Sequence, residues 1–179
     1  MMLRLSSLFL LLVLLSGCRA DSTPERPNIL FIFADDQRTD TIGAWGNDLI
    51  ETPALDRLAA TGMNFRDAHV MGSIHGAVCQ PSRAMLMTGR SLYHVYAQLD
   101  TVKTFPQQLQ EHGYVTFGTG KWHQSQASFA KSFGIGRHIL FGGMSAHDAV
   151  PVRQMREDGT FTDIDSLAWS TDLYADAAI

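Results

Sequence analysis

Residues 79–90 read CQPSRAMLMTGR. The good helix formers between Ala84 and Met87 predict a helix over residues 81–87 that ends at Thr88-Gly89, because glycine readily takes the conformation that closes a helix. Cys79 then lies near the N-terminus of this helix and close to Arg83, where a thiolate is stabilised and can act as a nucleophile. The alternative for an unpaired cysteine is a small, buried apolar residue. The stretch by itself leaves both interpretations open.

Helices and strands alternate on both sides of this stretch. Residues 28–34, NILFIFA, form a continuous apolar run that is typical of a strand covered on both faces in a parallel sheet. The other elements expected up to residue 118 are a helix over 53–62, a strand over 63–70, a loop over 71–78, a helix over 104–112 and a strand over 114–118. This order predicts an α/β fold.

The pattern is looser beyond residue 120. Glycines at 134, 136, 142 and 143 indicate loops around a short strand over residues 139–141. A final helix opens near Ser170 and still runs through residues 175–179 without a C-cap glycine, so we expect the chain to be truncated there.

Charged side chains follow two of the expected strands, where an α/β sheet places its sites. The pair Asp35-Asp36 ends the first run, and two adjacent carboxylates can hold a divalent cation. Lys121 and His123 follow the strand over 114–118. The alternatives are a solvated turn for the two aspartates and surface positions for Lys121 and His123.

The N-terminus has the pattern of an export signal. Arg4 precedes an apolar run, residues 8–15, that is shorter than the roughly 20 residues a membrane-spanning helix needs. Leu15-Ser16-Gly17-Cys18 resembles the lipobox of bacterial lipoproteins, which predicts a signal over residues 1–18, a lipid anchor on Cys18 and a polar tether over 19–27. A plain secretory signal is the alternative. The expected location is periplasmic or at the cell surface.

Composition and cysteine count narrow the function. The chain has 45% hydrophobic residues and a formal net charge of -4 without a long basic run, which argues against a nucleic-acid partner. Cys18 and Cys79 are the two cysteines, so a lipidated Cys18 leaves Cys79 without a disulfide partner in the chain.

The motifs of residues 26–179 resemble the type I sulfatases. The family pattern is cysteine, any residue, proline, serine or alanine, arginine, with Thr-Gly-Arg downstream, and residues 79–90 fill every position. Other matching segments are Arg26-Pro27-Asn28, Asp35-Asp36, Thr52-Pro53 with Leu55, and Gly120-Lys121-Trp122-His123. One departure is Gln124-Ser125, where relatives often have leucine and glycine.

This resemblance implies a fold and a reaction. The fold is alkaline-phosphatase-like, with a mixed, mostly parallel sheet flanked by helices, and residues 28–179 are the N-terminal portion of the catalytic domain. A formylglycine-generating or sulfatase-maturating enzyme converts Cys79 to Cα-formylglycine. The hydrated aldehyde, a geminal diol, attacks the sulfur of a sulfate ester, and elimination from the resulting sulfo-enzyme regenerates the aldehyde.

It also implies roles for single residues. Asp35, Asp36 and the residue derived from Cys79 help bind Ca²⁺, with Mg²⁺ as the alternative. Arg83 stabilises the diol and Lys121 bridges it to a sulfate oxygen. His123 is the candidate base of the elimination step. Arg90 is expected to be structural, and His75 is left unassigned.

Several family parts have no counterpart in residues 1–179, among them a second metal-binding pair and the acid that protonates the leaving group. The fragment is therefore expected to have little or no activity alone. A sulfated carbohydrate is the expected substrate, with choline sulfate or an aryl sulfate as alternatives. The competing functions are a phosphonate or phosphate ester hydrolase of the same superfamily and a non-catalytic lipoprotein that binds sulfated glycans.

Overall fold

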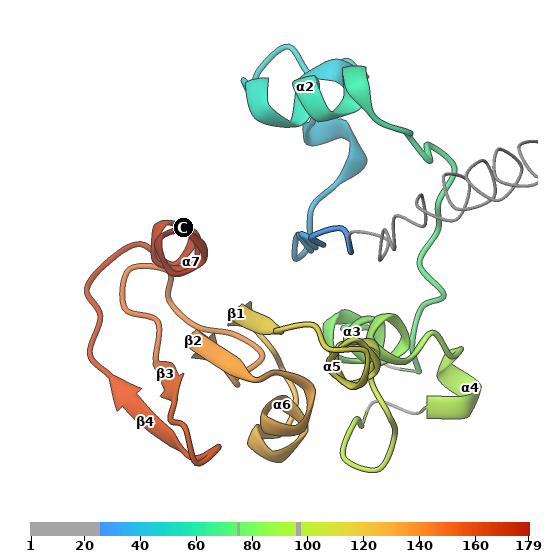
Figure 1. Ribbon diagram of the computed structural model, residues 1–179. Helices are drawn as coiled ribbons and strands as arrows, with labels where there is room; N and C mark the ends of the chain where they lie inside the picture. Colours follow the sequence, from blue (N-terminus) through green and yellow to red (C-terminus); the bar gives the residue numbers. More distant parts are fainter. Residues whose placement is uncertain (1–25, 75, 96–97) are drawn as a thin grey trace, which may run out of the picture. The chain divides into compact units, whose positions relative to one another are not determined.

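The computed structural model describes residues 26–74, 76–95 and 98–179, and the chain divides into two compact units, residues 1–34 and 35–179 (Figure 1). The predicted export signal and lipid-anchored Cys18 lie outside the described residues, as does His75. No helix among the described residues is long and apolar enough to cross a membrane.

The predicted strand over residues 28–34 is not formed. In the first unit the described residues, 26–34, have no regular secondary structure, and their apolar side chains are exposed, with Leu30 at 82% and Ile32 at 75%. The prediction is wrong because a strand needs a hydrogen-bonded neighbour, and residues 26–34 of this unit provide none. An apolar run predicts only a tendency to pair.

The second unit holds a four-stranded mixed sheet in the order β1-β2-β3-β4. Its strands are β1 Phe117–Lys121, β2 Ile135–Leu140, β3 Val152–Met155 and β4 Phe161–Ile164. Strands β1 and β2 are parallel and are joined through α6 Gln126–Ser132, whereas β2, β3 and β4 pair antiparallel. The expected α/β fold with a mixed sheet flanked by helices is confirmed, but the expectation of a mostly parallel sheet does not hold for the described residues, because β3 and β4 form a hairpin and β3 also pairs antiparallel with β2.

Strand positions differ from the predictions in physically understandable ways. The strand expected over 114–118 lies at Phe117–Lys121, and the one expected over 139–141 extends back to Ile135. The strand expected over 63–70 is absent, and Met63, Phe65 and Val70 are exposed. The β3–β4 hairpin was not predicted, because its short strands gain their stability from pairing with β2 and with each other.

The predicted helices are confirmed, because helix limits depend on local signals. The helices are α2 Pro53–Thr61, α3 Cys79–Thr88, α4 Leu92–Val95, α5 Phe105–Glu111 and α7 Ser170–Ala178, with short 3-10 turns at Thr39–Thr41 and Gly43–Trp45. Gly89 closes α3 in the left-handed conformation at φ 65°. The backbone N–H of Thr104 donates to the Gln107 side chain at the start of α5, at 2.9 Å. The helices α4 and α6 were not predicted.

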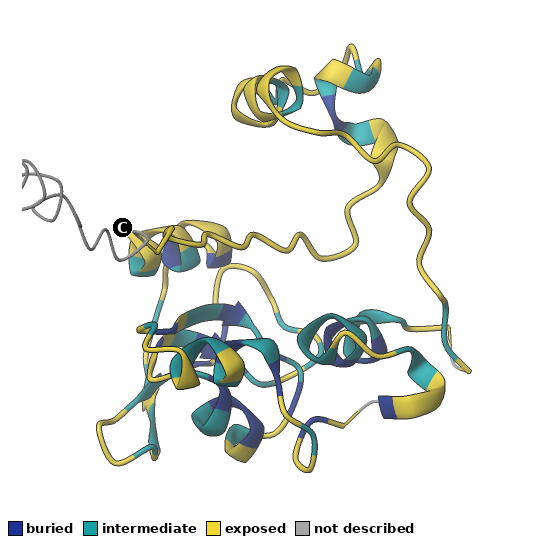
Figure 2. Ribbon diagram, turned by 45° about the vertical axis from the view of Figure 1, so that its right-hand side comes forward, coloured by how far each residue is buried: buried dark blue, intermediate teal, exposed yellow. Residues whose placement is uncertain are grey.

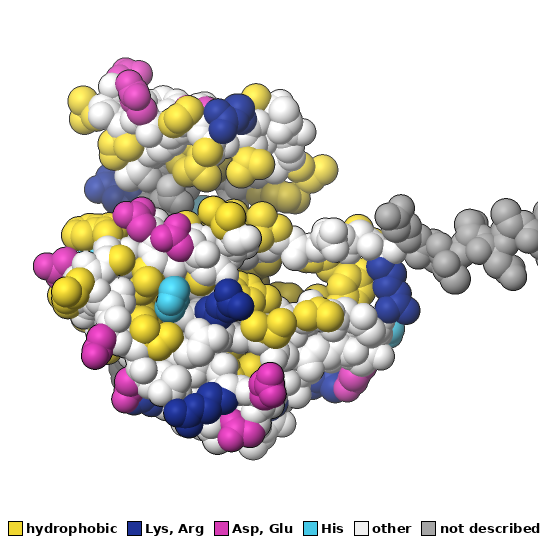
Figure 3. Space-filling model, turned by 60° about the vertical axis from the view of Figure 1, so that its left-hand side comes forward, with side chains coloured by type: hydrophobic (Ala, Val, Ile, Leu, Met, Phe, Trp, Pro, Cys, Tyr) yellow, Lys and Arg dark blue, Asp and Glu magenta, His cyan; other side chains and the backbone are white. Residues whose placement is uncertain are grey.

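Neighbouring residues of β2 face opposite sides of the sheet, and each side is covered by a helix. Ile139 belongs to a cluster with Phe129 of α6 and Trp122, while Leu140 packs with Leu173 of α7. Buried residues therefore concentrate on the sheet and its covering helices (Figure 2). Basic and acidic side chains are interspersed on the face drawn in Figure 3, with no extended basic patch there.

Trp122 anchors the segment that follows β1. Its side chain is 4% exposed, and its ring nitrogen donates to the Ser125 carbonyl at 3.2 Å and to Ser128 Oγ at 3.0 Å. The indole ring also packs edge-on against Phe129, with ring centroids 5.4 Å apart. A residue held so firmly fixes the backbone on both sides of it, which is where Lys121 and His123 lie.

Candidate active site

Cys79 is the first residue of α3, and Arg83 lies one helical turn further on. Arg83 is 4% exposed, and its guanidinium donates to the Cys79 carbonyl at 3.1 Å and to the Lys121 carbonyl at 3.0 Å. A buried arginine needs such partners because desolvating its charge is costly. Arg83 thereby joins the start of α3 to the end of β1.

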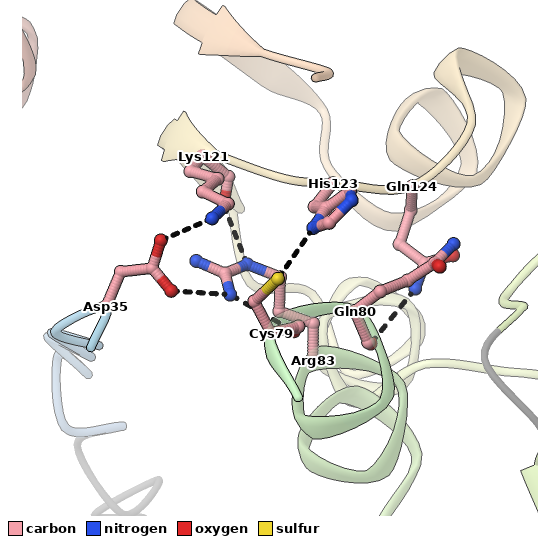
Figure 4. A network of polar contacts seen from close by, with 7 residues as sticks. All are labelled: Asp35, Cys79, Gln80, Arg83, Lys121, His123 and Gln124. Atoms are coloured by element: carbon pink, nitrogen blue, oxygen red, sulfur yellow. Dashed lines mark hydrogen bonds and ion pairs between the residues drawn. The ribbon is translucent and has the colours of Figure 1, made fainter. Parts of the chain in front are cut away.

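Lys121 and His123 flank the buried Trp122 and extend toward Cys79 (Figure 4). Lys121 is the last residue of β1, and His123 has φ 55°, a left-handed conformation that is uncommon outside glycine. The Nδ1 atom of His123 lies 3.1 Å from Cys79 Sγ. Residues 44 positions apart in the sequence are thus brought into hydrogen-bonding contact.

Asp35 completes this group of charges. Its carboxylate accepts from Lys121 Nζ at 2.5 Å and from Arg83 at 3.4 Å. Burial tends to raise the pKa of Asp35, but the hydrogen bond from Lys121 and the positive charges of Arg83 and Lys121 outweigh it, so the pKa lies below its usual value. Asp35 is therefore an anion that holds two cations beside Cys79.

Asp36, the sixth predicted site residue, lies apart from this network. It is exposed, has φ 55° and makes no hydrogen bond or ion pair with the other five among the described residues. Arg90 is exposed just after α3, and its backbone N–H donates to Thr88 Oγ1, so a structural role for its side chain stays a prediction.

The described residues do not by themselves form a metal site. They contain no group of three or more histidine, cysteine, aspartate or glutamate side chains placed to hold an ion. The oxygen donors of Asp35 and Asp36 suit a hard cation such as Ca²⁺, which takes six to eight oxygen ligands. Two carboxylates therefore fit as a fraction of its coordination shell.

The pKa of His123 is lowered from its usual value of 6.5. Burial is the main cause, because it penalises the charged imidazolium, and the positive charges of Lys121 and Arg83 act in the same direction, while Asp35 opposes them. His123 is consequently neutral at pH 7, and in the tautomer that carries its proton on Nε2 it can accept a proton at Nδ1, which faces Cys79.

Exchanging Lys121 for methionine is expected to raise the pKa of His123, because a positive charge beside the imidazole is lost. The ring protons of His123 followed by NMR across pH 4–9 would measure this. Lys103→Met is the matched control, since Lys103 pairs with Glu111 on the exposed side of α5, and it should leave the titration unchanged. A downward or absent shift in Lys121→Met would contradict the electrostatic assignment.

The same lowered pKa has a consequence for stability. The unfolded chain binds more protons at His123 than the folded chain does between the folded pKa and 6.5, so folding is favoured less as the pH falls through this window. The contribution of His123 is fully present above pH 6.5 and is lost on acidification.

Gly143 is a site residue that sequence reasoning missed. A Cβ atom added there would lie 2.5 Å from Nε2 and 2.7 Å from Cε1 of His123, which is too close for any real contact. The neighbouring Gly142 has room, because its added Cβ would meet Leu140 and Met144 at 3.5 and 3.7 Å. The glycine pair indicated a loop, but only the folded chain shows which member touches the imidazole.

Gly143→Ala is expected to displace the His123 ring and to lower the free energy of unfolding by about 1–3 kcal/mol, the usual cost of overpacking. Urea denaturation gives the free energy, and the His123 ring signals in NMR give the displacement. Gly142→Ala, one residue away, should change neither. Equal effects of the two substitutions would show that the close approach to His123 is not the cause.

Comparison with known proteins places this site in a family. The Sulfatase family model matches residues 27–174. The chain is 37% identical to N-acetylglucosamine-6-O-sulfatase of Bacteroides thetaiotaomicron over 106 residues, which cover 55% of this chain and 18% of that protein. It is 36% identical to arylsulfatase A of Bos taurus over 162 residues, 82% of this chain and 30% of that protein. It is also 36% identical to human iduronate 2-sulfatase over 132 residues, 64% of this chain and 23% of that protein.

The chain spans less than a third of the length of the curated relatives that it matches, between 17% and 30%. The matched region contains the cluster of Asp35, Cys79, Arg83, Lys121 and His123. From this match over most of its length, the chain belongs to the sulfatase family.

Proposed function

We propose that the protein carrying this chain is a sulfuric ester hydrolase in which Cys79, converted to formylglycine, is the nucleophile. The observation that carries the proposal is the position of Cys79 Sγ, 3.1 Å from a neutral imidazole and beside the network of Arg83, Lys121 and Asp35. Membership of the sulfatase family supports it. The positive charges of Arg83 and Lys121 suit an anionic ester group.

Arg83 and Lys121 hold the sulfate group. A sulfate monoester carries a negative charge, and two cations fixed by hydrogen bonds attract it without having to reorganise. Asp35 binds the ammonium group of Lys121 and the guanidinium of Arg83, and so keeps both cations at the reacting centre. The contacts of Arg83 with the backbone carbonyls of Cys79 and Lys121, and of both cations with the Asp35 carboxylate, hold the two cations near each other.

His123 moves the proton. Formylglycine supplies a hydrated aldehyde, one hydroxyl of which attacks sulfur while the S–O bond to the alcohol breaks and the alcohol leaves with a proton. The second hydroxyl then loses its proton, the C–O bond to the sulfate breaks, and sulfate leaves as the aldehyde carbonyl is regenerated. The Nδ1 atom of His123 faces the side chain at position 79. Because the imidazole is neutral at pH 7, it accepts the proton that the second hydroxyl loses in the elimination step. Arg83 donates to the carbonyl of residue 79 and fixes the backbone that carries the nucleophile.

Asp35 and Asp36 are the proposed ligands for Ca²⁺, with Mg²⁺ as the alternative, together with the side chain at position 79. A bound divalent cation would favour the negative charge that develops on the sulfate oxygens. Both aspartates offer carboxylate oxygens, and Asp36 is exposed and therefore accessible to an ion. The remaining ligands of the cation would come from elsewhere in the full protein.

Two measurements test the hydrolase proposal. Trypsin cleaves after Arg66 and Arg83 and releases the peptide that contains Cys79, whose mass reports the conversion of the thiol to an aldehyde. The full protein, co-expressed with a formylglycine-generating or sulfatase-maturating enzyme, should hydrolyse an aryl sulfate far faster than an aryl phosphate. A preference for the phosphate would indicate a phosphohydrolase, and an unmodified thiol in the native host would support the non-catalytic, glycan-binding alternative.

We also propose a cellular location and a natural substrate for the protein. Export as a lipoprotein anchored through Cys18 rests on residues 15–18, and mass spectrometry of the mature N-terminus tests it, since an unmodified residue after Ala20 would refute the anchor. A sulfated carbohydrate is the proposed substrate, because two relatives are named as N-acetylglucosamine-6-O-sulfatase and iduronate 2-sulfatase.

A further inference from the structure

We infer that a hollow beside His123 binds the alcohol half of the substrate and selects alcohols that carry several hydroxyl groups over flat apolar ones. This inference rests on the proposed sulfatase activity. The hollow has a volume of about 270 Å³. His123 borders it together with Gln80, Gln98, Asp100, Gln124, Ser125 and Phe141.

The charges around the site determine which half of the sulfate ester, the sulfate or the alcohol, can enter the hollow. Arg83, Lys121 and Asp35 lie on one side of the contact between Cys79 and His123, and Gln80 and Gln124 lie on the other (Figure 4). The lining residues of the hollow include no lysine or arginine, and Asp100 carries an acidic side chain there.

A sulfate group would be repelled by Asp100 and attracted by Arg83 and Lys121. The sulfate is therefore held by the cations, and the alcohol that leaves points into the hollow. His123 lies at the boundary between the two halves, because it contacts Cys79 and also lines the hollow.

The walls of the hollow are held in place by the fold. Ser125, the N-cap of α6, donates its hydroxyl to the Asp100 carboxylate. Lys131 of α6 donates to the carbonyls of Asp100 and Val102 at 2.8 and 2.7 Å. Gln124, 8% exposed, donates to the Gln80 carbonyl at 3.3 Å. A preorganised wall binds a ligand at a lower entropic cost.

Several polar groups of the hollow are left for a ligand. The side-chain amides of Gln80 and Gln98 make no hydrogen bond to any residue that the structure describes. One oxygen of Asp100 accepts from Ser125, and a carboxylate has capacity for more donors. Amides both donate and accept, as do the hydroxyl groups of a sugar, and Phe141 adds an apolar ring.

An aryl group cannot satisfy these amides and this carboxylate. Binding it would displace water from them without replacing the hydrogen bonds, and a site built for hydrogen bonding discriminates strongly against such a ligand. An alcohol with several hydroxyl groups can instead form hydrogen bonds in place of those that the displaced water made. Gln124 and Ser125 place further polar side chains in the wall.

The test compares two esters in the full, matured protein: N-acetylglucosamine 6-sulfate and p-nitrophenyl sulfate. Asp100→Ala is expected to lower kcat/KM for the sugar sulfate about tenfold, the value of a lost hydrogen bond to a charged group, and to change kcat/KM for the aryl sulfate less than twofold. Gln98→Ala should act in the same direction. Asp176→Ala, on the exposed part of α7, is the matched control and should alter neither ester.

Binding of the methyl glycoside of N-acetylglucosamine, which carries no sulfate, tests the sugar-binding hollow separately from the hydrolase proposal. The glycoside should shift the His123 ring signals in NMR, with a dissociation constant about tenfold higher in Asp100→Ala. That result in a protein that hydrolyses no sulfate ester would refute the hydrolase and retain the sugar-binding hollow. An equal loss for both esters in Asp100→Ala, or a glycoside that leaves His123 undisturbed, would overturn the hollow as the specificity site.

Discussion

Replacing Cys79 with alanine is expected to lower kcat for sulfate ester hydrolysis by at least about 10⁴-fold in the full, matured protein, because the nucleophile is removed. No neighbouring side chain can replace it. Arg83 and Lys121 are cations that cannot form the reactive aldehyde, and His123 is placed to accept a proton from the nucleophile. Turnover of an aryl sulfate and the mass of the tryptic peptide are the measurements.

The control for this experiment lies on the same helix. Met85→Leu conserves the volume of a partly buried side chain of α3 and should leave turnover within about twofold of the unmodified protein. Circular dichroism of both variants shows whether α3 is retained. Substantial turnover by Cys79→Ala with an intact fold would exclude residue 79 as the nucleophile.

His123→Ala should lower kcat by about 10²- to 10⁴-fold, the usual contribution of a positioned acid or base. The pH profile is the more specific readout. Activity of the unmodified protein should fall on the acidic side as His123 is protonated, and this limb should lie below pH 6.5 because burial, Lys121 and Arg83 lower the pKa. The variant should lose this limb.

Two further observations distinguish a base from a structural histidine. Added imidazole should restore part of the activity of His123→Ala, because the cavity that the ring leaves borders the open hollow. His112→Ala, at the exposed C-cap of α5, is the matched control and should keep the rate and the pH profile. An acidic limb that persists unchanged in His123→Ala would assign it to another group.

Helices and the site signature could be predicted because their signals are local. The limits of α2 and α3 follow from proline at the first turn and glycine after the last, which act through neighbouring residues along the chain. The segments that supply Cys79, Arg83, Lys121 and His123 could be identified because they resemble the motifs of the type I sulfatases, and the structure places these four together with Asp35.

Strands could be predicted less well because pairing depends on distant residues. The apolar run over residues 28–34 has the composition of a buried strand, yet it forms none, whereas β3 and β4 have weaker patterns and form a hairpin. The hydrogen bonds of a strand come from another segment, and composition does not specify that segment.

The sequence by itself determined the family, the helices α2, α3, α5 and α7, and the candidate site residues other than Gly143. Only the tertiary structure decided that Cys79 faces Nδ1 of His123, that Asp35 and not Asp36 holds the cations, and that Gly143 lies against the imidazole. The physical reason is that a sequence motif depends on residues close together in the chain, whereas the geometry of the site depends on residues far apart in it. A motif records which chemical groups are available, whereas distances of about 3 Å between them depend on packing around Trp122 and Arg83, which the whole unit must fold to create.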